Sequence, residues 1–183
     1  FTIAIDVAAT QFYDQNTGFY LWRGKEKTIE DMIVFYQKIL EEYPVYSIED
    51  GCAEQDIAGW KRLFGQLAGK GVQIVGDDLF VTNINFIAEG LREELANAAI
   101  IKPNQTGTIS EALEAVTLCQ KTNMNAIVSH RSGETIDTFI ADFAVGVNAG
   151  QIKAGGPCRG ERMAKYNRLL FIEDALTMLM LDE

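Results

Sequence analysis

The sequence lacks the run of about eighteen or more apolar residues that a transmembrane helix requires, so we expect no membrane insertion. Cysteine is also scarce. Cys52, Cys119 and Cys158 are odd in number, scattered along the chain and without the spacing of a zinc site. We expect them to be reduced thiols of an intracellular, cytoplasmic protein, where they serve as small buried residues.

Positive charge is in short supply too. The chain has 16 Lys and Arg against 26 Asp and Glu, which gives a formal net charge of −10. Such a balance argues against direct nucleic-acid binding, although a local basic pocket is compatible with it. With 183 residues, 48% of them hydrophobic and 23% charged, the chain is long and apolar enough for one soluble domain with a sizeable core.

The start of the chain has no initiator methionine, leader peptide or capping signal. Phe1 is followed directly by a strand-like pattern that ends at Asp6. This is neither a signal peptide nor an ordinary N-terminus, and we expect the chain to be a piece of a longer protein. No linker or low-complexity segment interrupts the sequence, so residues 1–183 are expected to form one domain.

Short apolar stretches alternate with helical patterns through the whole sequence. Strands are expected at residues 3–5, 46–48, 73–76, 99–101, 126–128 and 150–153, and helices at 28–40, 55–70, 83–95, 108–122, 136–146 and from about 161 onward. Thr28 with Asp31 and Thr108 with Glu111 have the spacing of capping boxes. An aromatic hairpin is expected within residues 11–20. The alternation favours an α/β fold with a parallel sheet covered by helices.

Every expected strand ends in an ionisable side chain. These residues are Asp6, Glu49, Asp77, Lys102, His130 with Arg131, and Lys153. Their spacing is close to the roughly 30 residues per βα unit of a (β/α)8 barrel, in which the carboxyl ends of all strands face one rim. We therefore expect an incomplete TIM-type barrel, with about six of eight βα units and one pocket at its rim.

Asp6, Glu49 and Asp77 follow three consecutive strands, so they are expected to lie side by side. Three clustered carboxylates repel one another unless a cation neutralises them, and hard oxygen ligands suit Mg²⁺. Asp50 and Asp78 are the next residues along the chain and are expected to support the ligands. The alternative is that each carboxylate only caps the loop that follows it.

Lys102 and Lys153 end apolar strands, where a lysine is costly unless it is used. We expect a nearby Mg²⁺ and the second lysine to lower the lysine pKa toward that of a usable base. The alternative is that both lysines form structural ion pairs with the carboxylates.

His130, Arg131 and Ser132 form a compact polar group after the fifth strand. Arg131 is suited to bidentate binding of a phosphate or carboxylate, and Ser132 stands where a helix N-cap is expected. The dipole of that helix would then favour an anion. The alternatives are a structural histidine and a serine that only caps a helix. A Ser–His–Asp hydrolase is not supported, because no nucleophile elbow is present.

Seven motifs in succession give a family resemblance. They are Ile5-Asp6-Val7-Ala8-Ala9, Ser47-Ile48-Glu49-Asp50-Gly51, Gly76-Asp77-Asp78-Leu79-Phe80-Val81-Thr82-Asn83, Lys102-Pro103-Asn104-Gln105-Thr106-Gly107-Thr108, Ser129-His130-Arg131-Ser132-Gly133-Glu134-Thr135, Gly150-Gln151-Ile152-Lys153, and Arg159-Gly160-Glu161-Arg162-Met163-Ala164-Lys165-Tyr166-Asn167. In this order the motifs resemble the barrel domain of the enolases, and Glu49-Asp50-Gly51 resembles the bacterial branch.

The resemblance implies a lyase of glycolysis and gluconeogenesis, which reversibly dehydrates 2-phosphoglycerate to phosphoenolpyruvate. It implies that Asp6, Glu49 and Asp77 bind Mg²⁺, and a lysine or histidine base with Mg²⁺ is the pattern described for the enolase superfamily. Lys102 would take the C2 proton, and Arg131 with Ser132 would hold the phosphate. His130 and Lys153 would contact the substrate at the catalytic centre, where Glu49 and Asp77 would also lie. A homodimer of the full-length protein is also implied.

The resemblance also implies missing parts. An enolase has an N-terminal domain, two earlier barrel strands and a general-acid glutamate, and none of these is in the sequence. We therefore expect the chain alone to have little or no activity. One alternative is another Mg²⁺-dependent member of the superfamily that acts on a non-phosphorylated acid. The other is a non-catalytic, protein-binding role, as a component of an RNA-degradation assembly or as a secreted or cell-surface plasminogen receptor.

Overall fold

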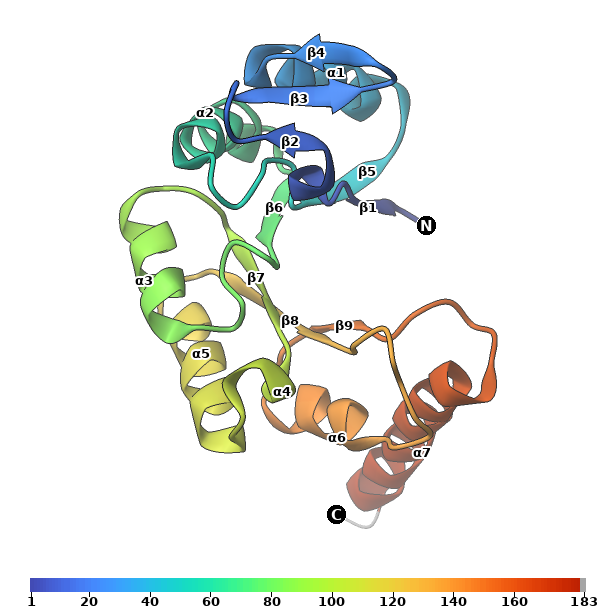
Figure 1. The fold of residues 1–183 in the computed structure, drawn as a ribbon. Coiled ribbons are helices and arrows are strands. Elements are labelled where there is room, and N and C mark those ends of the chain that lie inside the picture. The colour runs from blue at the N-terminus through green and yellow to red at the C-terminus, as the bar shows by residue number, and fades with distance from the viewer. Residues whose placement is uncertain (182–183) are drawn as a thin grey trace.

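The computed structural model describes residues 1–181 and contains a six-stranded parallel sheet (Figure 1). The strands are β1 (Ile3–Asp6), β5 (Val45–Glu49), β6 (Gln73–Gly76), β7 (Ala98–Ile101), β8 (Asn125–Ser129) and β9 (Gln151–Lys153), in this spatial order. Each strand pairs with the one before it in parallel register. All six expected strands are therefore present, and their carboxyl ends meet at one edge.

Most helices lie between consecutive strands in the sequence and along the outer face of the sheet, and the last helix lies against the helix before it (Figure 1). They are α1 (Ile29–Glu42), α2 (Ile57–Leu67), α3 (Ile84–Arg92), α4 (Pro103–Thr106), α5 (Ile109–Lys121), α6 (Phe139–Gly146) and α7 (Gly160–Leu181), with short 3-10 helices η1 (Ala9–Phe12) and η2 (Ala68–Lys70). This arrangement confirms the α/β class.

The sheet has an apolar layer on each of its two faces, because successive side chains of a strand point to opposite faces. Ile74, Ala99 and Val128 belong to the large core cluster between the sheet and the helices. Val75 and Ile100, one position further along their strands, belong to a small separate cluster on the other face. The concave face therefore has its own thin apolar layer, and polar side chains lie above and below it.

The sheet is curled so that its first and last strands come together at the carboxyl end. Lys153 of β9 donates a hydrogen bond to the carboxylate of Asp6 in β1, with an Nζ–Oδ2 distance of 3.2 Å. Near the amino ends, the Gln73 and Gln151 side chains bond each other, although β6 and β9 are not neighbours in the sheet. The expected incomplete TIM-type barrel is confirmed: the sheet is a half-barrel whose concave face collects side chains from distant strands.

The expected aromatic hairpin is present as β2 (Tyr13–Asp14) and β3 (Phe19–Trp22), and a third strand, β4 (Lys25–Lys27), extends it into a small antiparallel sheet. Tyr20 is fully buried beneath this sheet. Its hydroxyl donates to Asp56 Oδ2 at 2.8 Å and accepts the Ala53 backbone N–H. The hairpin is thereby fixed to the loop before α2.

The capping predictions are largely correct. Thr28 and Asp31 form both bonds of a capping box at the start of α1. Thr108 accepts the Glu111 backbone N–H, but the Glu111 carboxylate accepts a bond from the Thr108 hydroxyl rather than from its backbone. The short helix α4 was not expected. Pro103 at its first position fits a helix start, where a missing N–H costs little.

The helix expected to start near Ile136 begins later. Helix α6 starts at Phe139, after the N-cap residue Thr138, and the preceding residues form a loop closed by local bonds. Asp137 Oδ1 accepts the Phe139 backbone N–H, and the Thr135 hydroxyl accepts the Asp137 N–H. These local bonds compete with the helix and delay its start.

Two features of the described residues bear on the sheet's surroundings. Strand β1 is mostly exposed and lies at one edge of the sheet, and Leu170, Phe171 and Met178 of α7 are more than half exposed. Open edges and apolar faces of this kind favour contact with further protein segments.

In the described part of the chain, no helix combines the length and the apolar character that a membrane crossing needs.

Candidate active site

The ionisable residues at the strand ends come together at the carboxyl rim of the half-barrel. Lys153 Nζ lies 2.7 Å from Glu49 Oε1 and 3.2 Å from Asp6 Oδ2, and so bridges two carboxylates from neighbouring strands. Lys102 pairs with Asp77 Oδ2 in the same way. Two lysines and three carboxylates from five strands thus form one charged group.

Asp77 differs from the other members of this group because one of its carboxylate oxygens is buried without a partner among the described residues. It is buried, and its Oδ2 atom is occupied by Lys102. Its Oδ1 atom is buried without a hydrogen-bond partner among the described residues. Because an unpaired buried carboxylate oxygen is costly, its position calls for a further ligand at this point.

The electrostatics of Glu49 and Lys153 follow from burial and pairing. Burial raises the pKa of the Glu49 carboxyl above its usual value, and the negative charges of Asp6 and Asp77 add to this against the opposing effect of Lys153. Burial disfavours the Lys153 ammonium, but the bonds and charges of Glu49 and Asp6 outweigh it and raise the Lys153 pKa. The carboxylate neighbours of Lys153 stabilise its charge, and the expected lowering of a lysine pKa by a nearby Mg²⁺ stays a prediction.

Asp50 connects three strand ends through its backbone and carboxylate. Its Oδ1 accepts the backbone N–H of Asp77 and its Oδ2 that of Asp78, both at 3.0 Å. Its own N–H donates to the Val75 carbonyl, and its carbonyl accepts the Ala9 N–H. Burial raises the pKa of Asp50 to about 7, against these two backbone hydrogen bonds. Asp50 makes these contacts from a left-handed backbone conformation, with φ 44°.

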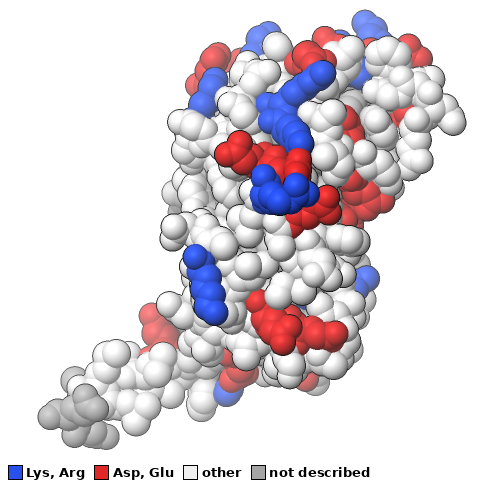
Figure 2. All heavy atoms as spheres, turned by 90° about the vertical axis from the view of Figure 1, so that its left-hand side faces the viewer, with Lys and Arg blue, Asp and Glu red and all other residues white. Residues whose placement is uncertain are grey.

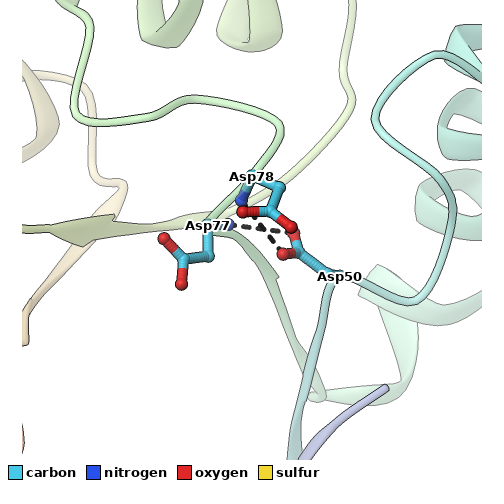
Figure 3. A group of neighbouring side chains, drawn as sticks. All are labelled: Asp50, Asp77 and Asp78. Carbon is cyan, nitrogen blue, oxygen red and sulfur yellow. Dashed lines mark hydrogen bonds between the residues drawn. The ribbon is translucent and has the colours of Figure 1, made fainter. Parts of the chain in front are cut away.

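A second group of carboxylates, Asp50, Asp77 and Asp78, offers oxygens that lie within 4.8 Å of one another. Figure 3 shows that the Asp77 carboxylate points away from the other two, and that Asp50 faces the backbone of its neighbours. Both Asp50 oxygens already accept backbone N–H groups. This geometry makes Asp50 a support for the loop and leaves the Asp77 carboxylate directed elsewhere.

The backbone of Lys102 is hydrogen-bonded to Thr82, a fully buried residue with a left-handed φ of 59°. The Thr82 hydroxyl accepts the Lys102 backbone N–H at 2.9 Å and donates to Gln105 Oε1 at 2.7 Å. Sequence reasoning did not single out Thr82. Its role depends on a strained loop conformation that no local pattern reveals.

The segment of His130, Arg131 and Ser132 follows β8 at the same rim. The His130 backbone N–H donates to the Lys153 carbonyl at 2.9 Å, which fixes the segment against β9. Arg131 is exposed and lines an open pocket of about 600 Å³ with Asn104 and other polar residues. The expected N-cap role of Ser132 is wrong, because α6 begins only at Phe139 and Ser132 is an exposed loop residue.

The first turns of α7 supply contacts that sequence reasoning missed. Lys165 is 1% exposed, pairs with Glu134 and donates to the Thr135 carbonyl at 2.6 Å. Arg162 contacts the His130 ring and donates to the Ser132 carbonyl at 3.2 Å. The only signal in the sequence was that both residues lie in one of the resembling motifs.

Charges on the flank of the molecule alternate in sign. On the face drawn in Figure 2, basic and acidic groups lie next to one another. Lys61 and Arg92 both pair with Glu93, and Arg62 pairs with Glu30. A nucleic-acid interface typically has a continuous basic stripe, whereas the charges on the face drawn in Figure 2 are mixed in sign.

A half-barrel with paired lysines and carboxylates at its carboxyl rim belongs to the class of α/β-barrel domains that bind ligands at that end. The family model described as "Enolase, C-terminal TIM barrel domain" matches residues 1–180. The chain belongs to this family.

Three relatives support the assignment. The chain is 53% identical to the enolase of Anaplasma phagocytophilum over 176 residues, 96% of this chain and 40% of the relative. It is 51% identical to the enolase of Helicobacter hepaticus over 173 residues, and 49% identical to that of Wolinella succinogenes over 176. These matches cover 93% and 95% of the chain, and 40% and 41% of the relatives. The chain thus spans about two fifths of the length of the curated relatives that it matches.

Proposed function

We propose that the chain is the main part of the catalytic barrel domain of an enolase, which converts 2-phosphoglycerate reversibly to phosphoenolpyruvate in the cytoplasm. On this proposal residues 1–183 form the C-terminal domain. The N-terminal domain and the first barrel strands belong to the longer protein, which acts as a homodimer. The observation that carries the proposal is the Asp77 Oδ1 atom, which is buried without a partner among the described residues, at a rim where lysines already pair with Asp77 Oδ2 and with Glu49.

The rim residues fit a divalent cation. Asp6, Glu49 and Asp77 offer only carboxylate oxygens, which suit Mg²⁺, and the free Asp77 oxygen has no other partner among the described residues. Burial raises the pKa of Glu49, and the negative charges of Asp6 and Asp77 add to this rise, which supports placing the three carboxylates near one another. When bound there, Mg²⁺ would neutralise these charges and stabilise the negative charge that develops on the substrate carboxylate.

In this proposal the reaction removes a proton from C2 and hydroxide from C3. Lys102, in its unprotonated form, accepts the C2 proton. The electron pair of the C–H bond becomes the C2–C3 double bond as the C3–O bond breaks. The hydroxide leaves as water, with a proton from an acid that this chain does not supply. Thr82 fixes the backbone of Lys102, and Asp77 lies against its side-chain nitrogen, so the nitrogen is positioned for a proton transfer.

The remaining residues position the substrate in this proposal. Lys153, between Glu49 and Asp6, keeps its positive charge and is suited to hold an anionic substrate group. Arg131 is exposed beside the rim, with Nη1 3.5 Å from Asn104 Oδ1, and its guanidinium is suited to bind the phosphate, with Ser132 as the next residue. His130, held against β9, contacts the substrate between them.

The test is the exchange of the C2 proton of 2-phosphoglycerate with deuterated water in the longer protein. Lys102→Ala should reduce exchange by about 10²–10⁴-fold or more, the usual contribution of a general base. Lys153→Ala should weaken substrate binding and leave the bound substrate able to exchange. Exchange that persists in Lys102→Ala and disappears in Lys153→Ala would assign the base to Lys153 instead.

A further inference from the structure

Helix α7 holds the only histidine of the chain by one of its two ring nitrogens. Arg162, in the first turn of α7, contacts His130 Nδ1 through Nη1. Its other terminal nitrogen, Nη2, donates to the Ser132 carbonyl at 3.2 Å. The Arg162 guanidinium thus contacts both the His130 ring and the backbone of the segment that follows β8.

The chemistry of the two groups decides where the imidazole hydrogen lies. A guanidinium has five N–H donors, no acceptor and a permanent positive charge. Nδ1 must therefore act as the acceptor in this contact. A neutral imidazole carries one hydrogen, which then lies on Nε2, and the neighbouring guanidinium disfavours a second positive charge on the ring.

The surroundings of Arg162 leave it little freedom to move away. Gly155 passes directly beside it with a left-handed φ of +88°, and a Cβ there would lie 2.7 Å from Arg162 Cδ and 3.1 Å from His130 Cε1. The Tyr166 hydroxyl donates to the Gly155 carbonyl and fixes this passage. One turn further along α7, the buried Lys165 binds the far end of the same loop through the Thr135 carbonyl.

We propose that Arg162 is a positioning residue that fixes His130 as the neutral tautomer with its hydrogen on Nε2. His130 therefore presents a hydrogen-bond donor at the rim and is not available there as a proton acceptor. The tautomer follows from the contact with Arg162 alone. Its use as a donor to an anionic substrate rests on the proposed function.

Nitrogen-15 NMR of the imidazole tests the tautomer directly, because the 183-residue chain has a single histidine. Long-range proton–nitrogen spectra at mildly alkaline pH separate a protonated ring nitrogen from an unprotonated one. The chain should show one tautomer, with Nε2 protonated. Arg162→Lys, which keeps a donor, should retain this pattern, and Arg162→Leu should lose it for a mixture of both forms.

Arg162→Glu is the decisive variant, because a carboxylate only accepts hydrogen bonds. It should move the Nδ1 signal from the acceptor to the donor range. Arg159→Gln changes a nearby exposed arginine, for which no side-chain hydrogen bond occurs among residues 1–181, and should leave the spectrum unchanged. Circular dichroism reports whether each variant is folded.

Three outcomes would overturn the proposal. These are a hydrogen on Nδ1 in the unsubstituted chain, a doubly protonated ring under the same conditions, or a folded Arg162→Glu chain that keeps Nε2 protonated. If Arg162→Glu does not fold, the retention by Arg162→Lys and the loss in Arg162→Leu decide. None of these readouts needs turnover, so failure of the proposed function would leave the tautomer result intact.

Discussion

The concave face of the half-barrel has two polar layers, and they differ in how completely their groups are paired. Near the amino ends of the strands, Gln73 bonds both Gln151 and Asn125 through neutral amides. At the carboxyl rim, by contrast, lysines and carboxylates pair only in part, and Asp77 Oδ1 lacks any partner among the described residues.

The difference shows which end of the domain is prepared for a ligand. Amides that satisfy one another leave nothing for a ligand to add, so the lower layer stabilises the curl of the sheet. At the rim, by contrast, carboxylates lie close together and one carboxylate oxygen has no partner among the described residues, so a bound cation would stabilise the group. Function is therefore expected at the rim and stability at the opposite end, as in other barrels.

The largest expected effect is the difference in catalytic activity between the 183-residue chain and the longer protein. The 183-residue chain alone should show no measurable formation of phosphoenolpyruvate, whereas the longer protein should be active, because the proposed reaction takes its general acid from outside this chain. Absorbance of the phosphoenolpyruvate formed from 2-phosphoglycerate measures both. Equal turnover by the two proteins would contradict the proposed division of the site.

The second prediction concerns Mg²⁺ alone, measured by titration calorimetry. Asp77→Asn should weaken binding by more than the roughly 10–100-fold loss typical of residues that only support a ligand. Asp78→Asn is the matched control and should have a much smaller effect, because Asp78 is not one of the three proposed ligands Asp6, Glu49 and Asp77, although it lies close to Asp77. Equal losses in the two variants would place the cation among Asp50, Asp77 and Asp78 instead.

The third prediction removes the bridge between the first two strands of the sheet. Lys153→Met leaves Glu49 buried beside Asp6 without a cation, which should cost about 2 kcal/mol of unfolding free energy at neutral pH, discounted because Lys153 is one third exposed. Urea denaturation measures this loss, and Lys121→Met serves as an exposed control. Added Mg²⁺ should reverse much of the loss, and no such recovery would argue against a cation at the rim.

The smallest effect is expected at the lower layer. Gln73→Leu leaves the Gln151 and Asn125 amides without their shared partner, and it should cost about 1–2 kcal/mol of unfolding free energy. Mg²⁺ affinity should stay unchanged in the calorimeter. A loss of Mg²⁺ binding in this variant would show that the two layers are not independent.

The sequence predicted the half-barrel and its rim because both depend on local patterns. Each strand is a short apolar stretch that is visible in its own residues, and each rim charge lies at the end of a strand or directly after it, as Asp77 follows Gly76. Relations between distant segments were not predictable in this way. The clamp of Arg162 on His130 joins residues 32 positions apart, and the late start of α6 depends on a network of loop bonds around Asp137.

The bond between Lys153 and Asp6 joins residues 147 positions apart, which has a consequence for how the domain folds. Contacts of such long sequence separation form late, because a long segment of chain must first be ordered to bring them together. During synthesis, Asp6 and Glu49 leave the ribosome well before Lys153, so their charges stay uncompensated until the ninth strand is made. We therefore expect the rim to assemble late, and nascent chains that end before Lys153 should remain targets for chaperones and proteases.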